Sequence, residues 1–214
     1  MSNQRILVLG THNIKKGREL AELLAPFGFV LRTLADIPNA VEVEETGTTF
    51  AENAALKATV QAKHLGCWVL GEDSGLAVDA LHGAPGVYSA RFSGPDATDE
   101  TNNAKLLSEL ADVPLERRNA HYICHAVLSD PSGVIQAESE DYCRGRILFE
   151  PSGISGFGYD PLFEIPEYHR TFGELGSAVK TVLSHRSRAM RAIIPTIVSL
   201  AMLGRWNTTN VASQ

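Results

Sequence analysis

The sequence has few cysteines and no long apolar run. Its three cysteines, Cys67, Cys124 and Cys143, are an odd set without a C-x-x-C pair. This argues against a disulfide framework or a zinc knuckle and favours a reducing compartment. The apolar run Ile6 to Leu9 is much shorter than the core of a signal peptide, and the stretch from Ala192 to Leu203 is interrupted by a proline and too short to span a bilayer. We therefore expect a cytoplasmic protein with no membrane partner.

An excess of basic residues is also missing. The chain has 19 lysines and arginines against 25 aspartates and glutamates, for a net charge of −6. Domains that bind nucleic acid are normally basic, so we expect no nucleic-acid partner. An acidic protein still binds a small polyanion when a few lysines and a divalent cation meet in a cleft. The composition, 44% hydrophobic and 21% charged, is typical of a globular protein with a substantial core.

The first third of the chain predicts an α/β fold. Arg5 to Leu9 has the pattern of a buried strand, Thr11 to Asn13 offer caps for a helix that Pro26 stops, and Phe27 to Leu31 is a second strand candidate. A strand followed by a helix and another strand is typical of α/β proteins. We expect one domain over residues 1–206 without a clear linker, followed by a polar tail at residues 207–214.

A second helix is predicted with both ends defined. Thr49 to Glu52 form a capping box, so we expect a helix from Phe50 to Leu65 that stops at Gly66. The next apolar run, Trp68 to Leu70, predicts a short strand with an acidic sequence just past its end. Further expected elements are a loop over 81–99, a helix over 102–111, strands over 121–128, 134–138 and 146–150, an irregular segment over 151–166 and a final helix over 184–203.

Two polar segments in the first half could bind phosphate or metal. Gly10 to Lys16 form a strand-to-helix turn whose backbone amides suit an anion, but the run lacks the spacing of a Walker A loop. A capped helix with solvated lysines fits it as well. Glu42, Glu44 and Glu45 precede Lys57, and by spacing alone these are more simply explained as exposed side chains.

The most informative acidic pair is Glu72-Asp73. Two adjacent acids directly after a buried strand are costly unless a cation offsets them, and Mg²⁺ prefers one or two carboxylates together with substrate phosphates. A solvated turn that ends the strand explains the pair equally well.

Two polar segments in the second half could bind a base. Ser155 to Asp160 contains two glycines around Phe157, with a second flat ring at Tyr159, although inward packing of these rings is the simpler explanation. Ser184 is a good helix cap, which places His185 and Arg186 in the first turn, where cations are disfavoured unless an anionic or carbonyl-bearing ligand is near.

Taken together, these runs resemble the inosine triphosphate pyrophosphatases, from about Ile6 to Leu203. The resemblance is carried by residues 11–16, by Glu44-Glu-Thr-Gly47 with Thr49-Phe-Ala-Glu-Asn-Ala-Ala-Leu-Lys57, by Glu72-Asp-Ser-Gly-Leu76, by Gly83-Ala-Pro-Gly-Val-Tyr-Ser-Ala-Arg91, by Gly156-Phe-Gly-Tyr-Asp160 and by Ser184-His-Arg186. It implies Mg²⁺-dependent hydrolysis of XTP, ITP and dITP to the nucleoside monophosphate and pyrophosphate. It also implies a long twisted mixed β-sheet with flanking helices, two lobes around a central groove, and a homodimer.

The resemblance also assigns roles to individual residues. Asp73 is the expected general base and a metal contact, Glu45 the main metal-binding acid, and Glu44 and Glu72 its helpers. Lys16 and Lys57 are expected to neutralise the triphosphate during catalysis. The phosphate end is expected to contact Thr11, His12, Asn13, Ile14, Lys15, Lys16 and Ser74, and the base and sugar Phe157, Gly158, Tyr159, Asp160, Lys180, His185 and Arg186.

Two other functions fit parts of the sequence. A pyrophosphatase of the Maf-like group would prefer a pyrimidine or a methylated base. A nucleotide-binding regulator without catalysis would have no need for a base such as Asp73 beside Glu45, Lys16 and Lys57. A general acid or base must be positioned and tuned, which argues for the enzyme.

Overall fold

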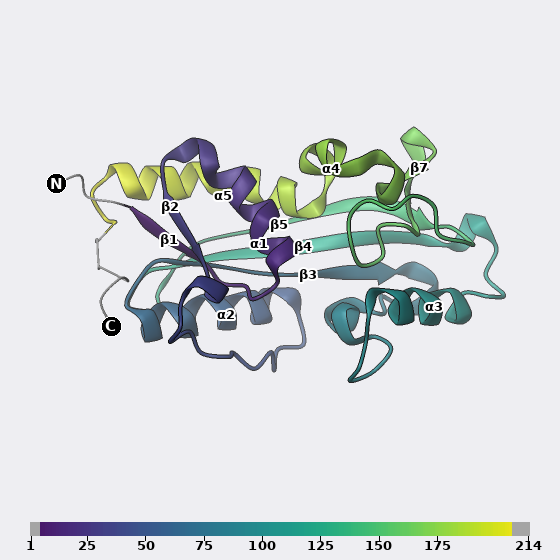
Figure 1. Cartoon of the computed structure of the whole chain (residues 1–214), viewed down its shortest axis with the longest axis horizontal. Helices are drawn as coiled ribbons and strands as arrows, with labels where there is room; N and C mark the ends of the chain where they lie inside the picture. The colour runs from purple at the N-terminus through teal and green to yellow at the C-terminus, as the bar shows by residue number, and fades with distance from the viewer. Residues whose placement is uncertain (1–4, 207–214) are drawn as a thin grey trace. The chain divides into compact units, whose positions relative to one another are not determined.

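The protein is described from a computed structural model that covers residues 5–206 (Figure 1), so the predicted polar tail at 207–214 lies outside the described residues. Its main elements in chain order are β1 (Ile6–Leu9), α1 (Ile14–Leu24), β2 (Val30–Thr33), α2 (Phe50–Leu65), β3 (Val69–Val78), α3 (Asp99–Glu109), β4 (Asn119–Ser129), β5 (Ile135–Ile147), β6 (Phe163–Ile165), β7 (Arg170–Thr171), α4 (Phe172–Leu183) and α5 (His185–Met202). Short 3₁₀ turns occupy several of the connections.

The strands form one mixed sheet in the order β2-β1-β3-β4-β5-β6-β7. β1 pairs in parallel with both β2 and β3, whereas β6 pairs antiparallel with β5 and β7. The expected mixed α/β sheet is therefore confirmed. The chain divides into two compact units; the first comprises residues up to 73, 124–140 and from 186 onward, and the second comprises 74–123 and 141–185.

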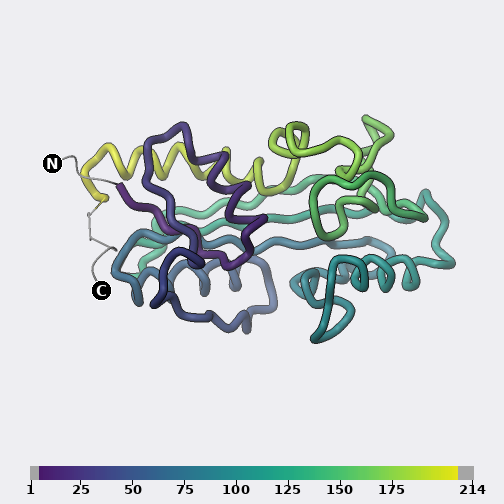
Figure 2. The backbone as a smooth tube through the Cα atoms, in the orientation of Figure 1, coloured from purple at the N-terminus to yellow at the C-terminus, as the bar shows by residue number. Residues whose placement is uncertain are grey.

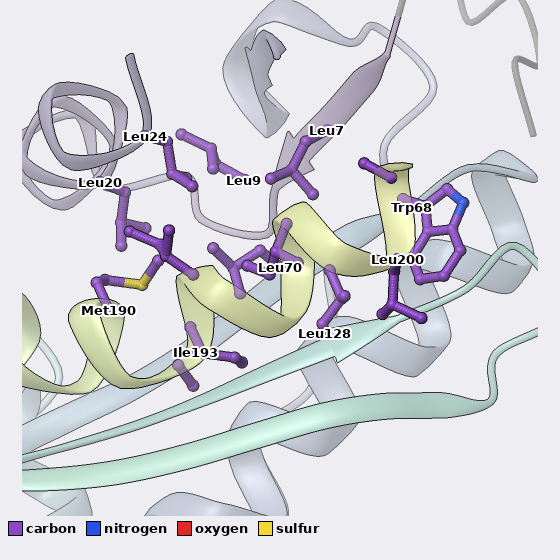
Figure 3. Packing of buried hydrophobic residues seen from close by; sticks show 14 of the residues in the cluster. Leu7, Leu9, Leu20, Leu24, Trp68, Leu70, Leu128, Met190, Ile193 and Leu200 are labelled. Atoms are coloured by element: carbon purple, nitrogen blue, oxygen red, sulfur yellow. The ribbon is translucent and has the colours of Figure 1, made fainter. Parts of the chain in front are cut away.

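In the first unit, helices cover both faces of the strands (Figure 1). Leu7, Leu9 and Leu70 point to the face covered by α1 and α5, where they pack with Leu20 and Met190 (Figure 3). The alternate residues point to the other face, where α2 lies. Because neighbouring strand residues face opposite ways, β1 is buried on both sides, which explains its continuous apolar sequence.

Gly71 lets α2 pack directly on β3. A Cβ atom at this position would lie 2.6 Å from the carbonyl oxygen of Ala54 and 2.7 Å from the amide nitrogen of Ala58. No side chain fits between backbones at such distances, so the glycine is required by the close approach of helix and strand. The capping box predicted at Thr49 and Glu52 is present and begins this helix as expected.

The second unit has an aromatic core. Tyr122 of β4, Phe163 of β6 and Phe172 of α4 contact one another. Leu106 of α3 and Leu110, which follows this helix, are buried in the same cluster. Figure 2 traces the long irregular connection from the end of β5 to β6; irregular structure was expected as far as residue 166, but β6 begins at Phe163.

The structure differs from the predicted elements in several places. β3 does not end at Leu70 but continues to Val78, so Glu72 and Asp73 lie inside the strand. β5 is a single strand through residues 143–145, where a connection was expected, because Gly145 allows close contact with the backbone of Glu164. Helix α4, which carries two glycines, was not predicted. Among the described residues, no helix is long and apolar enough to cross a membrane.

Candidate active site

The acidic pair is divided between the two faces of β3. Glu72 and Asp73 are consecutive strand residues, so their side chains point in opposite directions. Both are buried, with exposed fractions of 1% and 5%. The explanation of the pair as a solvated turn is therefore wrong, and each carboxylate has its own set of cations.

Asp73 lies on the face of α2. Its Oδ1 accepts a hydrogen bond from Lys57 Nζ at 2.7 Å, and its Oδ2 accepts one from Asn53 Nδ2 at 3.3 Å. Lys57 Nζ also lies 3.3 Å from Glu45 Oε1. Two carboxylates, from the loop before α2 and from β3, thus converge on one ammonium group. Glu44, the neighbour of Glu45, is exposed.

This environment raises the pKa of Asp73. Burial raises the pKa of its carboxyl group, and the opposing effects of Lys57 and Lys16 are smaller, so the pKa stays above the ordinary value. Burial alone would lower the pKa of Lys57, but Asp73, Glu72 and Glu45 raise it, so the lysine remains charged. A buried carboxylate beside a charged lysine is suited to accept a proton from water.

Glu72 lies on the opposite face, against two cations. Its Oε2 accepts a hydrogen bond from Arg186 Nη2 at 3.4 Å, and its Oε1 lies 3.1 Å from Lys16 Nζ. The thiol of Cys124 also donates to Oε2 at 3.4 Å. Arg186 pairs in addition with Glu19 of α1. These contacts join α1, β3, β4 and α5 within the first unit.

The charges around Glu72 keep it ionised. Burial would raise the pKa of this carboxyl group, but Arg186, then Lys16 and Lys57, hold it far below the ordinary value. The pKa of Arg186 is raised because Glu72 and Glu19 outweigh the effect of burial. The two adjacent acids therefore have pKa values displaced in opposite directions, the pattern that separates a proton acceptor from a permanently charged partner.

The strand-to-helix turn before α1 is capped from within. Asn13 Oδ1 accepts hydrogen bonds from the backbone amides of Lys15 and Lys16, at 3.0 and 3.1 Å, and Thr11 Oγ1 accepts one from the amide of Asn13. The expectation of free amides is wrong for Lys15 and Lys16. His12, Asn13 and Ile14 are exposed, and the half-buried Lys16 is the turn residue that reaches Glu72.

A second polar cluster lies within the second unit. Lys180 Nζ donates to Asp160 Oδ2 at 2.6 Å and lies 4.1 Å from the centre of the Phe157 ring. Asp160 also accepts hydrogen bonds from the amide of Phe157 and, at 3.4 Å, from the hydroxyl of Tyr122. The Tyr122 ring stacks on His185, with the ring centres 4.7 Å apart. The structure therefore brings four of the predicted base-binding residues together around Tyr122.

Gly158 and Tyr159, in the loop that also carries Phe157 and Asp160, are held by α3 and by the 3₁₀ turn Gly86–Arg91. Tyr159 is buried and donates its hydroxyl to the carbonyl oxygen of Ser89 at 2.8 Å, so its ring packs inward. Asn103 Nδ2 donates to the carbonyl oxygen of Gly158 at 3.0 Å. Ser74, the first residue of the second unit, is half-buried.

Sequence reasoning missed several residues that shape these clusters. Asn53 and Glu19 contact the predicted site in the first unit, and Tyr122 does so in the second. The sequence could have indicated Asn53, because it precedes Lys57 by four residues and therefore lies on the same face of the helix. Glu19 and Tyr122 had none, because their contacts depend on pairings between distant segments.

The carboxylate oxygens at and near Asp73 are suited to bind a hard divalent cation. Among the described residues no group of three or more His, Cys, Asp and Glu side chains is arranged to hold a metal ion by itself. Mg²⁺ requires fewer protein ligands, because it is commonly bound by one or two carboxylates and substrate phosphates. Glu45 and Asp73 already converge on a cation, the ammonium group of Lys57, so their oxygens suit such a site.

The chain is similar in sequence to several known proteins. The chain is 59% identical to the dITP/XTP pyrophosphatase of Rhodopirellula baltica, over 91% of this chain and 93% of that protein. It is 50% identical to the dITP/XTP pyrophosphatase of Geobacter sulfurreducens, over 86% and 92%.

Solved structures give the same result. A HAM1 protein from Coxiella burnetii matches with a TM-score of 0.83 and 35% identity, covering 91% of this chain and 98% of that one. A nucleoside-triphosphatase, dITP/XTP pyrophosphatase, from Mycobacterium abscessus matches with a TM-score of 0.72 and 41% identity, over 90% and 99%. The model of the Ham1 family matches residues 7–196. The resemblance found in the sequence is confirmed, and the chain belongs to the Ham1 family.

Proposed function

We propose that the protein hydrolyses deaminated purine nucleoside triphosphates, such as XTP, ITP and dITP, to the nucleoside monophosphate and pyrophosphate. The observation that carries this proposal is the buried Asp73 carboxylate, with raised pKa, in contact with Lys57. Relatives at up to 59% identity bear the name dITP/XTP pyrophosphatase. The family match extends across both units, so in this proposal they form one catalytic domain.

Asp73 acts as the general base. It accepts a proton from water as the water oxygen bonds to the α-phosphorus, the bond from that phosphorus to the bridging oxygen breaks, and pyrophosphate leaves with the bond electrons. Lys57 holds Asp73 by one carboxylate oxygen, and together with Lys16 it offsets the charge of the phosphates. Such hydrolysis depends mainly on positioning the reactants and on compensating their charge, so the reaction needs no covalent nucleophile.

A divalent cation completes the charge balance. Lys16, Lys57 and Arg186 already face the carboxylates of Glu19, Glu45, Glu72 and Asp73, so three cations meet four anions before a triphosphate binds. Mg²⁺, held by Glu45 and Asp73 with Glu44 in support, would neutralise phosphate oxygens and polarise the reacting phosphorus. Glu72 was also expected to help hold the metal, but it lies on the other face of β3 against Lys16 and Arg186, so in this proposal it is not a ligand.

The second cluster recognises the base. Phe157 offers a ring face, and Lys180 and His185 offer donors to a purine that carries a carbonyl oxygen at position 6. A donor aimed at that oxygen would be left unmet by the amino group of adenine, which gives strong rejection when the donor is desolvated. Arg186 was also expected to contact the base, but its described contacts are to Glu72 and Glu19, so in this proposal it supports the catalytic strand.

A substrate panel tests the proposal. Pyrophosphate release is measured with XTP, ITP, dITP, ATP, GTP and a pyrimidine triphosphate, with Mg²⁺ and with EDTA. We expect rapid release from the first three only, lost in EDTA and restored by added Mg²⁺. Similar rates with ATP would contradict the base preference, and preference for the pyrimidine would favour a Maf-like activity. Binding of ITP without turnover would indicate a regulator. Light scattering of the same sample tests the expected homodimer.

A further inference from the structure

We propose that Asn53 is a positioning residue that orients Asp73 and ties it to the loop carrying Glu45. The proposal rests on the function proposed above, in which Asp73 is the base. Asn53 lies on α2, one turn before Lys57, and its side chain has no exposed surface. A residue so placed acts on the substrate only through its neighbours.

The amide of Asn53 bridges two segments of the first unit. Its Nδ2 donates to Asp73 Oδ2 at 3.3 Å, and its Oδ1 accepts a hydrogen bond from the backbone amide of Gly47 at 2.8 Å. Lys57 donates to the other oxygen of Asp73. Each oxygen of the carboxylate therefore has a donor, and the plane of the carboxylate is fixed by two side chains of one helix.

The Gly47 contact determines which way the Asn53 amide points. A backbone N–H only donates, so it selects the carbonyl oxygen of the Asn53 side chain as its partner. The amino group must then face Asp73, where it meets an acceptor. Both ends of the amide are satisfied in this orientation, and a flip would set two donors against each other at Gly47.

Gly47 is the point at which this bridge reaches the loop. A Cβ atom at Gly47 would lie 2.6 Å from Asn53 Oδ1 and 2.7 Å from Glu52 Cβ. The loop therefore lies against α2 as closely as its backbone allows. Because Gly47 is two residues from Glu45, the bridge relates the position of Glu45 to that of Asp73.

Gln61 provides a matched control on the same helix. It is also an amide with no exposed surface, and it also ties the loop to α2, through the backbone N–H and carbonyl of Val41. It has no described contact with Asp73. Loss of either amide removes an anchor of the loop, but only loss of Asn53 removes a donor from the proposed base.

The test measures kcat, KM and Tm for Asn53→Ala, Asn53→Asp and Gln61→Leu, with dITP as substrate and Mg²⁺ present. Removal of groups that orient reacting residues commonly costs about 10- to 100-fold in activity. We expect Asn53→Ala to lose kcat by this factor with KM changed less than about threefold. Asn53→Asp keeps the shape and the acceptor for Gly47 but sets a carboxylate against Asp73, and we expect an equal or larger loss of kcat. Gln61→Leu should keep kcat within about twofold.

The outcomes separate this proposal from the function on which it rests. Wild-type protein that releases no pyrophosphate from dITP or XTP would refute the function itself. With an active wild type, near-normal kcat in Asn53→Asp would overturn the positioning role, and this variant decides the matter if Asn53→Ala does not fold. An equal loss of kcat in Gln61→Leu would also overturn it, because loop anchoring alone would then explain the effect.

Discussion

Arg186 and Glu72 form an ion pair in which both side chains are almost completely buried. Arg186 Nη2 lies 3.4 Å from Glu72 Oε2, and the exposed fractions of the side chains are 2% and 1%. Two charges in such a place are tolerated only when each is matched, and Lys16 and Glu19 extend the pair to a network of four. The network holds α5 to β3 at the residue that precedes the proposed base.

Replacing Arg186 by Met should destabilise the protein strongly. Loss of one member of a buried pair leaves the other uncompensated, which costs about 3–5 kcal/mol. For a chain of this size that corresponds to a fall in Tm of roughly 10 °C, measurable by calorimetry. Arg188→Met, at an exposed arginine of the same helix, is the control and should change stability by less than about 0.5 kcal/mol. Equal effects of the two changes would contradict the network.

Replacing Asp73 by Asn should abolish most activity without unfolding the protein. The amide keeps the shape of the side chain but does not accept a proton from water, and loss of a general base costs about 10²-fold or more in kcat. Stopped pyrophosphate-release assays with dITP, together with circular dichroism, measure both effects. Turnover close to that of the wild type would remove Asp73 from the mechanism.

Replacing Gly71 by Ala should lower both stability and activity. The added methyl group would meet the backbone of α2 at Ala54 and Ala58, and overpacking of this kind costs about 1–3 kcal/mol. Displacement of α2 would also separate Lys57 from Asp73. Gly17→Ala is a control for stability, because its methyl group would meet side-chain methyls, of Thr33 at 3.2 Å and of Thr11 at 3.8 Å, rather than backbone. A stable and fully active Gly71→Ala variant would show that the close contact is unnecessary.

The capping box of α2 predicts a pH-dependent contribution to stability. Hydrogen bonds from Thr48 and Thr49 hold the pKa of Glu52 below its ordinary value. A depressed folded-state pKa stabilises above the pKa of the unfolded chain, and this contribution is lost as the pH falls through the folded-state value. The advantage of wild type over Glu52→Gln in urea unfolding should therefore shrink from pH 7 to about pH 3. An advantage of the same size at both pH values would contradict this prediction.

The sequence predicted those parts of the fold that depend on local chemistry. Helix α2 begins at Phe50 and ends before Gly66 as expected, because a capping box and a left-handed glycine act within a few residues. The strand predicted at the position of β3 was too short, because Gly71, Asp73 and Ser74 are residues typical of turns. They stay in the strand because distant cations and a distant helix compensate them, and no local pattern contains that information.

The candidate site divides in the same way. Lys57 and Asp73 were expected together and are found in contact, whereas the placement of Arg186 against Glu72 was not foreseen. Cations are disfavoured near a helix start, and we expected a ligand to compensate Arg186 there. The structure supplies acids from α1 and β3 instead. Residue types indicated the chemistry, but the pairing of segments far apart in the chain decides which charge meets which.

The division of Glu72 and Asp73 between the faces of β3 has a further consequence for the reaction cycle. In this proposal one carboxylate gains and loses a proton with every turnover, while its covalent neighbour keeps the same charge throughout. The ion pairs of Glu72 with Lys16 and Arg186 involve no atom of Asp73, so a proton gained by Asp73 removes none of these contacts.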